Sequence, residues 1–313
     1  MKIVDFTPGQ LEQAALLARL NYDEERFFVP ALPELARLPA LDGYAGEKRG
    51  VAALGGGELL GFFCWNEPQE GLFGPCKGAW SPVHAHGAVS RNRAEIYERL
   101  YQAAAERLVS GRVFSHAVTL YAHDEAALKG FFQGGFGGRC VDAVRETLPL
   151  AAPPCQGIRF RRAESGDAEA LARMRNRVSA HLSASPIFLP FSSPAAVAGT
   201  ADEIQGGQHP YFIALDGSRP VAFLRLQADG ENFAANDPSM MNISGAYTEP
   251  ELRGKGIATG LLAFMMDELR GHGIPRCGVD FESFNPEGRR FWLKHFTAYT
   301  TSVARRVDER ILN

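Results

Sequence analysis

The chain has 313 residues, which is enough for about two domains of ~150 residues each. A hydrophobic content of 45% with 22% charged residues is typical of a soluble globular protein with real cores. The net charge of −3 argues against a dedicated nucleic-acid binder, and no apolar run approaches the ~18 residues needed to cross a membrane.

The N-terminus and the cysteines indicate a reducing compartment. Asp5 stands where a signal peptide would need its apolar segment. The five cysteines include no C-x-x-C pair, which suggests free thiols and argues against a zinc framework. We therefore expect a cytoplasmic protein that binds no metal, nucleic acid or membrane, and a homodimer is left open. The cysteines are Cys64, Cys76, Cys140, Cys155 and Cys277.

The first half of the chain alternates strand and helix patterns. Two apolar runs are separated by Gly55-Gly56-Gly57-Glu58, which is a hairpin signal. Further on, Ile96, Leu100 and Leu108 fall on one side of a helix, and Gly111 lies just past its end. The patterns predict strands at 2–6, 51–54, 59–63, near 78–80, 113–121 and 139–148, helices at 10–22, 93–109 and 125–132, and a loop at 82–89.

A proline-rich linker follows. Residues 148–157 contain three prolines, including the pair Pro153-Pro154, and a strand pattern begins again directly after them. We therefore expect two domains, one at 1–150 and one at 151–313.

The second half repeats the alternation. Asp216-Gly217-Ser218 forms a turn cluster between two strand patterns, and Gly271-His272-Gly273 ends a helix. The patterns predict strands at 158–162, 211–215, 220–227, 241–248, 277–282 and 299–307, and helices from the cap Asp167 to about 181, at 257–270 and at 286–295.

Short strings recur between the two halves. Leu17-Ala18-Arg19-Leu20 matches Leu171-Ala172-Arg173-Met174, and the string at 131–136 matches the one at 291–296. Such a long period indicates duplicated domains rather than a solenoid. Strands that alternate with helices, together with hairpins, predict an α/β fold with a mixed sheet and helices on both faces.

The most informative stretch connects a strand to a helix at 249–258. Two glycines there allow close backbone approach and positive φ, and the first turn of the helix presents unpaired N–H groups. Arg253 and Lys255 add positive charge to the positive end of the helix dipole. This combination favours binding of a phosphate group.

The spacing fits neither a Walker loop nor the dinucleotide fingerprint, which would need a glycine at Thr259. It resembles the pyrophosphate loop of the GNAT N-acetyltransferase superfamily, [Q/R]-x-x-G-x-[G/A], filled here by Arg253, Gly256 and Ala258. The resemblance covers both halves and implies two tandem GNAT-like domains, each a mixed, mostly antiparallel twisted sheet flanked by helices. It also implies a transferase of the N-acetyltransferase type, which would move the acetyl group of its co-substrate acetyl-CoA to a small-molecule amine.

The resemblance further implies which residues hold acetyl-CoA. In the family the strand before the loop is splayed, so free backbone groups at Ala246, Tyr247 and Thr248 would bind the pantetheine arm and polarise the thioester carbonyl. Asn285 stands where the family often has an asparagine that contacts this arm, although it also suits a plain helix cap. The residues expected around the pyrophosphate are Arg253, Gly254, Lys255, Gly256, Ile257, Ala258 and Thr259.

Two carboxylates are candidates for the general base. Asp280 and Glu282 are two residues apart on a strand and share one face, so each would raise the pKa of the other; the alternative is a solvated strand end. Trp292 occupies the place of a tyrosine that protonates the leaving thiolate in many GNAT proteins, and indole cannot give up its proton. Trp292 is therefore expected to contact the co-substrate or pack in the core, while water, Tyr247 or Tyr299 could supply the proton.

The two halves are not equivalent at the loop. The first has His84-Ala85-His86-Gly87 where the second has Arg253-Gly254-Lys255-Gly256. One glycine without a permanent cation disfavours a pyrophosphate site, so we interpret the first half as a silent copy with a structural role. His84 and His86 could begin a metal site, but no third ligand is evident.

Two other functions remain open from the sequence. One is a non-catalytic acyl-CoA-binding or regulatory protein with the same fold, which the missing tyrosine favours. The other is a module for phosphate ligands unrelated to CoA. The acceptor carries no recognisable motif; its pocket is expected to be built from 180–206 and the first half, with 183–193 as a loop over it.

Overall fold

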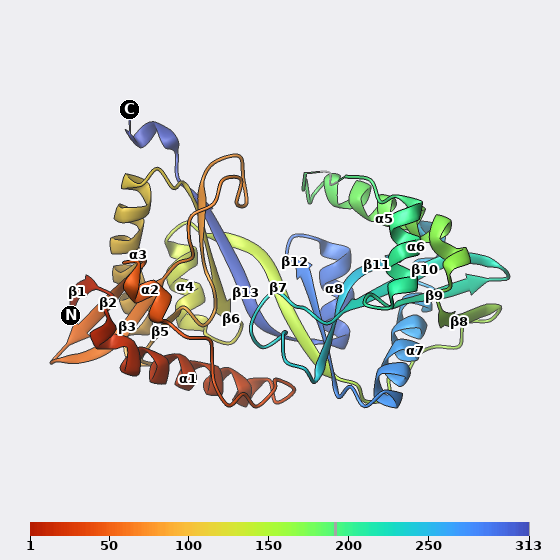
Figure 1. Ribbon diagram of the computed structural model, residues 1–313, viewed down its shortest axis with the longest axis horizontal. Coiled ribbons are helices and arrows are strands. Elements are labelled where there is room, and N and C mark those ends of the chain that lie inside the picture. Colours follow the sequence, from red (N-terminus) through yellow and green to blue (C-terminus); the bar gives the residue numbers. More distant parts are fainter. Residues whose placement is uncertain (191–192, 313) are drawn as a thin grey trace. The chain divides into compact units, whose positions relative to one another are not determined.

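The computed structural model describes residues 1–190 and 193–312. The chain divides into two compact units, which are described separately (Figure 1). Unit 1 comprises Met1–Asp142 together with Ala298–Asn313, and unit 2 comprises Ala143–Thr297. The units meet at 142/143 and 297/298, and these limits differ from the expected boundary between two duplicated domains. The boundary at 150/151 therefore stays a prediction.

Unit 1 contains an antiparallel sheet whose strands follow the order β1 (Lys2–Asp5), β2 (Gly50–Gly55), β3 (Glu58–Cys64) and β5 (His86–Ala88). The hairpin between β2 and β3 turns at Gly56 and Gly57, whose φ angles of 61° and 88° suit glycine. A second group of strands pairs β4 (Gly78–Ser81) parallel to β6 (Ser115–Tyr121), and β6 antiparallel to β13 (Thr297–Arg306).

The helices of unit 1 cover these strands with apolar faces. Leu100 of α3 and Phe131 of α4 belong to one buried cluster with Phe63 of β3, while Leu17 of α1 packs in another with Phe62. The helices are α1 (Leu11–Phe28), α2 (Asp42–Gly46), α3 (Arg93–Ser110) and α4 (Glu125–Gln133).

The predicted loop at 82–89 is wrong for its last part, because β5 pairs there with β3. His86 of this strand is buried and makes hydrogen bonds to the Tyr97 hydroxyl (3.0 Å) and the Thr119 carbonyl (2.7 Å). The ring is therefore part of the core. Among the described residues, no group of three or more His, Cys, Asp or Glu side chains could hold a metal ion.

In the described part of unit 2, neighbouring strands of the sheet follow the chain order β8 (Ile158–Arg162), β9 (Tyr211–Asp216), β10 (Arg219–Gln227), β11 (Met240–Thr248) and β12 (Arg276–Glu282). Pairing is antiparallel up to β11 and parallel between β11 and β12. The end of β7 (Gly137–Glu146) lies beyond β12, and the Thr147 amide donates to the Pro275 carbonyl at 3.0 Å.

Among the residues that the structure describes, the α-helices of unit 2 are α5 (Ala168–Ser183), α6 (Val197–Gly206), α7 (Ile257–Gly271) and α8 (Pro286–His295). Helix α6 was not predicted. Thr200 of α6 is buried and accepts a hydrogen bond from Arg175 of α5 at 3.2 Å, so tertiary contacts hold a glycine-containing segment helical. Of the predicted loop at 183–193, residues 191 and 192 lie outside the described residues. Short 3-10 helices occur at Pro8–Gln10, Ser165–Asp167, Pro250–Leu252 and Glu309–Leu312.

The first half runs strand, two helices, hairpin, two strands, helix, strand, helix and strand, and the second half repeats this order with the single strand β11 in place of β4 and β5. The predicted α/β fold class with mixed, mostly antiparallel sheets flanked by helices is confirmed. The last strand of each half has a partner outside its own half. Strand β13 pairs with β6 in unit 1, whereas the end of β7 belongs to unit 2.

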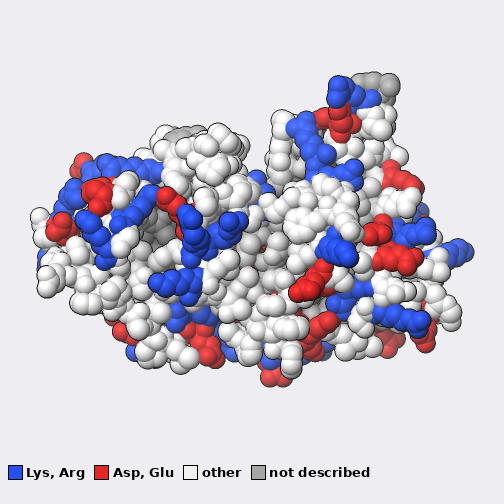
Figure 2. Space-filling view, turned by 180° about the vertical axis from the view of Figure 1, so that it is seen from behind, with Lys and Arg blue, Asp and Glu red and all other residues white. Residues whose placement is uncertain are grey.

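The charges agree with the low net charge of the chain. Figure 2 shows basic and acidic side chains interspersed on the surface that faces the reader. None of the described helices combines the length and apolar character needed to cross a membrane.

Candidate functional site

A bulge and an early end of pairing open the sheet of unit 2 at β11. Arg225 of β10 faces Gly245 and Leu226 faces Ile243, so Ser244 is an extra residue that bends the strand. The parallel register with β12 runs only from Met240 to Ile243. The backbone of 244–248 therefore has no recorded ladder partner on the β12 side, which is the splay that the sequence resemblance implied.

The loop after β11 has the backbone of a ligand cradle. Gly254 and Gly256 have φ angles of 74° and 82°, which favour glycine. The Arg253 amide donates to the Pro250 carbonyl at 3.2 Å, and the Gly260 amide donates to the Gly256 carbonyl at 2.9 Å. Between these two hydrogen bonds, the amides of residues 254–259 donate to no backbone carbonyl of the described residues. The first turn of α7 thus presents amide groups that lack an intrahelical acceptor.

Splayed strand and loop line the same cleft, of about 1010 Å³. The cleft also receives side chains from α5 and from α8. It contains every residue that the sequence assigned to the co-substrate: Ala246, Tyr247, Thr248, Arg253, Gly254, Lys255, Gly256, Ile257, Ala258, Thr259, Asn285 and Trp292.

The two predicted base candidates lie elsewhere. Asp280 is exposed and Glu282 half-buried on β12, and neither lines the cleft as the structure describes it. Tyr299 is buried in unit 1 and is likewise not among the cleft residues. Their catalytic roles stay predictions.

Three other predicted side chains have identifiable partners. Asn285 accepts a hydrogen bond from the Gly288 amide at 3.2 Å, so it caps α8 and lines the cleft as well. Trp292 is buried and packs edge-on against Phe296. The Arg253 guanidinium donates to the Thr248 carbonyl at 3.1 Å and pairs with Glu287 at 2.7 Å, which ties the loop to α8.

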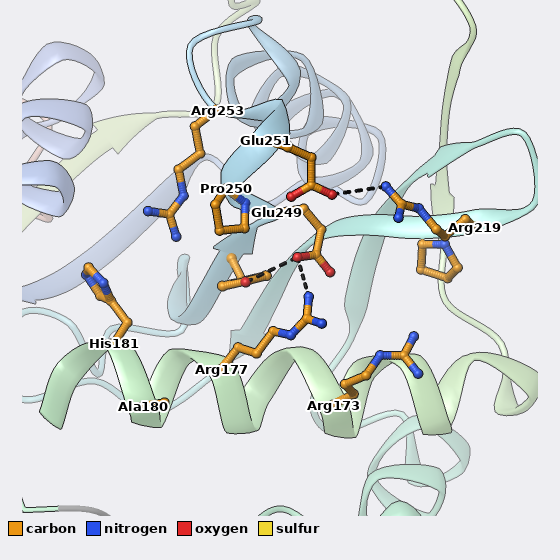
Figure 3. A pocket seen from close by; sticks show the side chains of 11 residues that line it. Arg173, Arg177, Ala180, His181, Arg219, Glu249, Pro250, Glu251 and Arg253 are labelled. Atoms are coloured by element: carbon orange, nitrogen blue, oxygen red, sulfur yellow. Dashed lines mark hydrogen bonds and ion pairs between the residues drawn. The ribbon is translucent and has the colours of Figure 1, made fainter. Parts of the chain in front are cut away.

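A polar network lies at the end of β11 (Figure 3). The Tyr247 hydroxyl donates to the Glu249 carboxylate at 3.3 Å, and Arg177 of α5 forms an ion pair with the same carboxylate. Glu249 is only 7% exposed, so a charge partner offsets its desolvation. Burial, followed by the Glu249 charge, raises the pKa of Tyr247 above its usual 10.0 despite the opposing effect of Arg177.

Glu249, His181 and Pro153 are site residues that the sequence analysis did not select. Glu249 reads as a turn residue before Pro250, and Pro153 as a linker residue. A Cβ built on Gly256 would lie 2.3 Å from Cγ of Pro153, so the linker touches the loop. The only sequence signal for Glu249 is its place one residue after the strand that carries Tyr247.

In the first half, a buried ion-pair network lies at the N-terminus of α3. Arg93, the first residue of α3, is buried and pairs with Glu24 at 2.7 Å and with Asp124 at 3.1 Å. The first residue of α3 is therefore held in an ion-pair network, whereas Ile257, the first residue of α7, lines the open cleft. The interpretation of the first half as a silent copy stays a prediction.

Comparison with known proteins identifies one family. Residues 181–296 match the sequence model of the acetyltransferase (GNAT) family. No curated protein matches the chain in sequence.

Several solved structures are similar to this chain, and the first described here shares its fold. A GCN5-related N-acetyltransferase from Sphaerobacter thermophilus has a TM-score of 0.56 and 14% identity, with 97% of this chain and 95% of that chain covered. A GCN5-related glucosamine N-acetyltransferase region of a fungal multi-domain GH3 β-N-acetylglucosaminidase has a TM-score of 0.50 and 13% identity, with 97% and 38% covered. A tandem GNAT protein from the clavulanic acid biosynthesis pathway has a TM-score of 0.46 and 12% identity, with 97% and 98% covered.

Proposed function

We propose that this chain, whose residues 181–296 form a domain of the GNAT acetyltransferase family, is an acetyl-CoA-dependent N-acetyltransferase acting on a small-molecule amine. The observation that carries the proposal is the cleft itself. A splayed strand and a glycine-rich loop at a helix N-terminus line one cavity of about 1010 Å³. The strand would hold the thioester, and the loop would hold the pyrophosphate.

The loop fits the diphosphate of acetyl-CoA. A Cβ built on Gly254 would meet no atom within 4 Å, so this backbone is open to a ligand. The amides of the first turn of α7 and the side chain of Lys255 would hold the negative charge. Arg253 would contribute by linking the loop to α8 through its bonds to the Thr248 carbonyl and Glu287.

Bound acetyl-CoA would supply the acetyl thioester, and the chain would position the amine and move its proton. The free backbone groups of Ala246 to Thr248 would hold the pantetheine arm and polarise the carbonyl. Holding the amine beside the thioester supplies effective concentration. The amine nitrogen forms the new C–N bond, the C–S bond breaks, and the departing thiolate takes up a proton.

We propose that the pair of Tyr247 and Glu249 handles both protons. Glu249 is a carboxylate bonded to Tyr247, which lines the cleft, and it can accept the proton of the amine, directly or through water. Tyr247 keeps its proton at neutral pH because its pKa is raised, so its hydroxyl can donate to the thiolate. This would replace the tyrosine that Trp292 displaces. Asp280 and Glu282 stay the alternative bases.

Calorimetry with acetyl-CoA, combined with release of free CoA thiol in the presence of a panel of primary amines, tests the proposal. We expect binding with one site per chain and amine-dependent thiol release. Binding without release for any amine would indicate the alternative function, a non-catalytic acyl-CoA-binding protein. Binding of ATP as tightly as CoA would indicate a general phosphate module.

A further inference from the structure

A second cavity, of about 630 Å³, adjoins the cleft in unit 2. It is called the arginine pocket here, after Arg173, Arg177, Arg219 and Arg253, which line it. His181, Tyr247 and Arg253 line both cavities, so a molecule that occupies one can extend into the other.

Helix α5 presents a basic stripe to this pocket. Arg173, Arg177 and His181 are spaced four residues apart, so they share one face of the helix, and all three line the pocket. Like charges at this spacing, here those of Arg173 and Arg177, destabilise a helix. Figure 3 shows these side chains rising from α5 toward the loop that follows β11. An anion bound in the pocket would offset this repulsion between the side chains of α5.

The acidic side chains of the pocket offset only part of this charge. Arg177 pairs with Glu249, and Arg219 pairs with Glu251 at 3.2 Å. Arg253 pairs with Glu287 of the neighbouring cleft at 2.7 Å, so three of the four arginines have a carboxylate partner and one positive charge is left over, whereas the whole chain carries −3. Within residues 1–190 and 193–312, Arg173 has no recorded ion pair.

We infer that the acceptor is an amine that also carries an anionic group, a carboxylate or a phosphate, and that Arg173 and Arg219 bind this group. The inference rests on the proposed acetyltransferase function. The amine would reach the cleft past Tyr247, while the anion stays in the arginine pocket. Guanidinium groups suit this task because their paired N–H donors match a carboxylate or phosphate.

The phosphates of CoA are the other source of an anion with this chemistry. CoA and dephospho-CoA differ only by the 3′-phosphate, so comparing their affinities shows whether the pocket binds this phosphate. An anion subsite for the acceptor should leave the affinities for both unchanged when Arg173 or Arg219 is replaced.

The first experiment measures binding of inorganic phosphate and of acetate by calorimetry, with and without CoA, to wild type, Arg173→Gln, Arg219→Gln and the double variant. Arg162→Gln is the matched control, since Arg162 is exposed on β8 and lines neither cavity. We expect each pocket variant to weaken anion binding about tenfold, the effect of one charged hydrogen bond, and the control to leave it unchanged. Arg177 is not used because its loss would strand the buried Glu249 carboxylate.

The second experiment compares acceptors in matched pairs, such as β-alanine with β-alaninamide and phosphoethanolamine with ethanolamine. The anionic member should have a KM about tenfold lower, and the pocket variants should remove this preference with little change in kcat. The inference would be overturned by equal KM values within each acceptor pair, or by anion binding that Arg173→Gln and Arg219→Gln do not alter. It would also be overturned if these variants lost affinity for CoA but not for dephospho-CoA. If acetyl-CoA itself fails to bind, the proposed function fails, and the anion titration still decides whether the pocket binds an anion.

Discussion

The Tyr247 hydroxyl and the Glu249 carboxylate are joined by a hydrogen bond of 3.3 Å at the point where β11 leaves the sheet. Both residues line the arginine pocket, and Tyr247 also lines the cleft. Arg177 holds the carboxylate from α5, so its orientation is fixed by two partners. A proton donor and a proton acceptor thus stand together beside the place proposed for the thioester.

Replacing Glu249 with glutamine should lower kcat by about 10²–10⁴-fold, the usual contribution of a general base. The amide keeps the shape and can still accept from Tyr247, so the affinity for CoA should change little. Steady-state kinetics of Glu249→Gln beside Asp280→Asn and Glu282→Gln locate the base. A large loss of kcat in either β12 variant, with Glu249→Gln near wild type, would return the base to the pair selected from the sequence.

Replacing Tyr247 with phenylalanine should lower kcat by about 10–100-fold while acetyl-CoA still binds, because only the hydroxyl is removed. The pKa of Tyr247 is raised above 10.0, so the hydroxyl keeps its proton throughout the neutral range and above it. Loss of that proton therefore cannot produce a falling limb in kcat between about pH 7 and 9. A limb in that range that disappears in Tyr247→Phe would contradict the raised pKa of Tyr247, and a kcat of Tyr247→Phe equal to that of wild type would refute the assignment of Tyr247 as the donor.

Alanine substitutions at three glycines separate backbone strain from ligand binding. Gly217, Gly254 and Gly256 all have positive φ, of 60°, 74° and 82°. Each substitution should cost about 1–2 kcal/mol of stability through the left-handed conformation. At Gly256 the new Cβ would also lie 2.3 Å from Pro153, so this variant should lose more. Thermal unfolding measures these differences.

The same three variants test where CoA binds. Calorimetry should show weakened CoA binding for Gly254→Ala and Gly256→Ala, and unchanged binding for Gly217→Ala, which lies outside the cleft. Equal effects at all three positions would mean that strain alone is responsible and that the loop does not contact CoA.

The loop was predictable from sequence because its signals are local. Glycine spacing, adjacent cations and the four-residue period of Ile257 and Leu261 all lie within one strand-to-helix connection. The network around Glu249 was not predictable, because Arg177 precedes it by 72 residues and no spacing rule joins them. The same holds for β5, whose three residues are all buried and show no alternation of polar and apolar side chains.

Strand partners are equally hidden from the sequence. The pattern at 299–307 predicts a strand correctly, but it carries no information that the partner is β6 of the first half. Pairing depends on which buried side chains meet, and Val303 and Tyr299 are buried in unit 1 rather than in the unit that precedes them in the chain.

The last strand of each half, β7 or β13, has a partner outside its own half, and this leads to a prediction about fragments. A fragment of residues 150–313 would carry β13 without its partner β6, exposing Tyr299 and Val303. It would also lack Arg145, whose guanidinium donates to the His295 carbonyl at 3.2 Å and lies over the Phe296 ring. We therefore expect this fragment to aggregate or to unfold without cooperativity, as exposed apolar strands do.

A fragment of residues 143–297 is the matched control, because it keeps the end of β7 and omits the exchanged strand. It should remain in solution, unfold cooperatively and retain a calorimetric signal with CoA, since every residue lining the cleft lies within it. Size-exclusion chromatography, thermal unfolding and calorimetry on both fragments make the comparison. If 150–313 is monomeric and binds CoA as tightly as the full chain, while 143–297 does not, then the second half folds with its own last strand, and the first half is dispensable for the site.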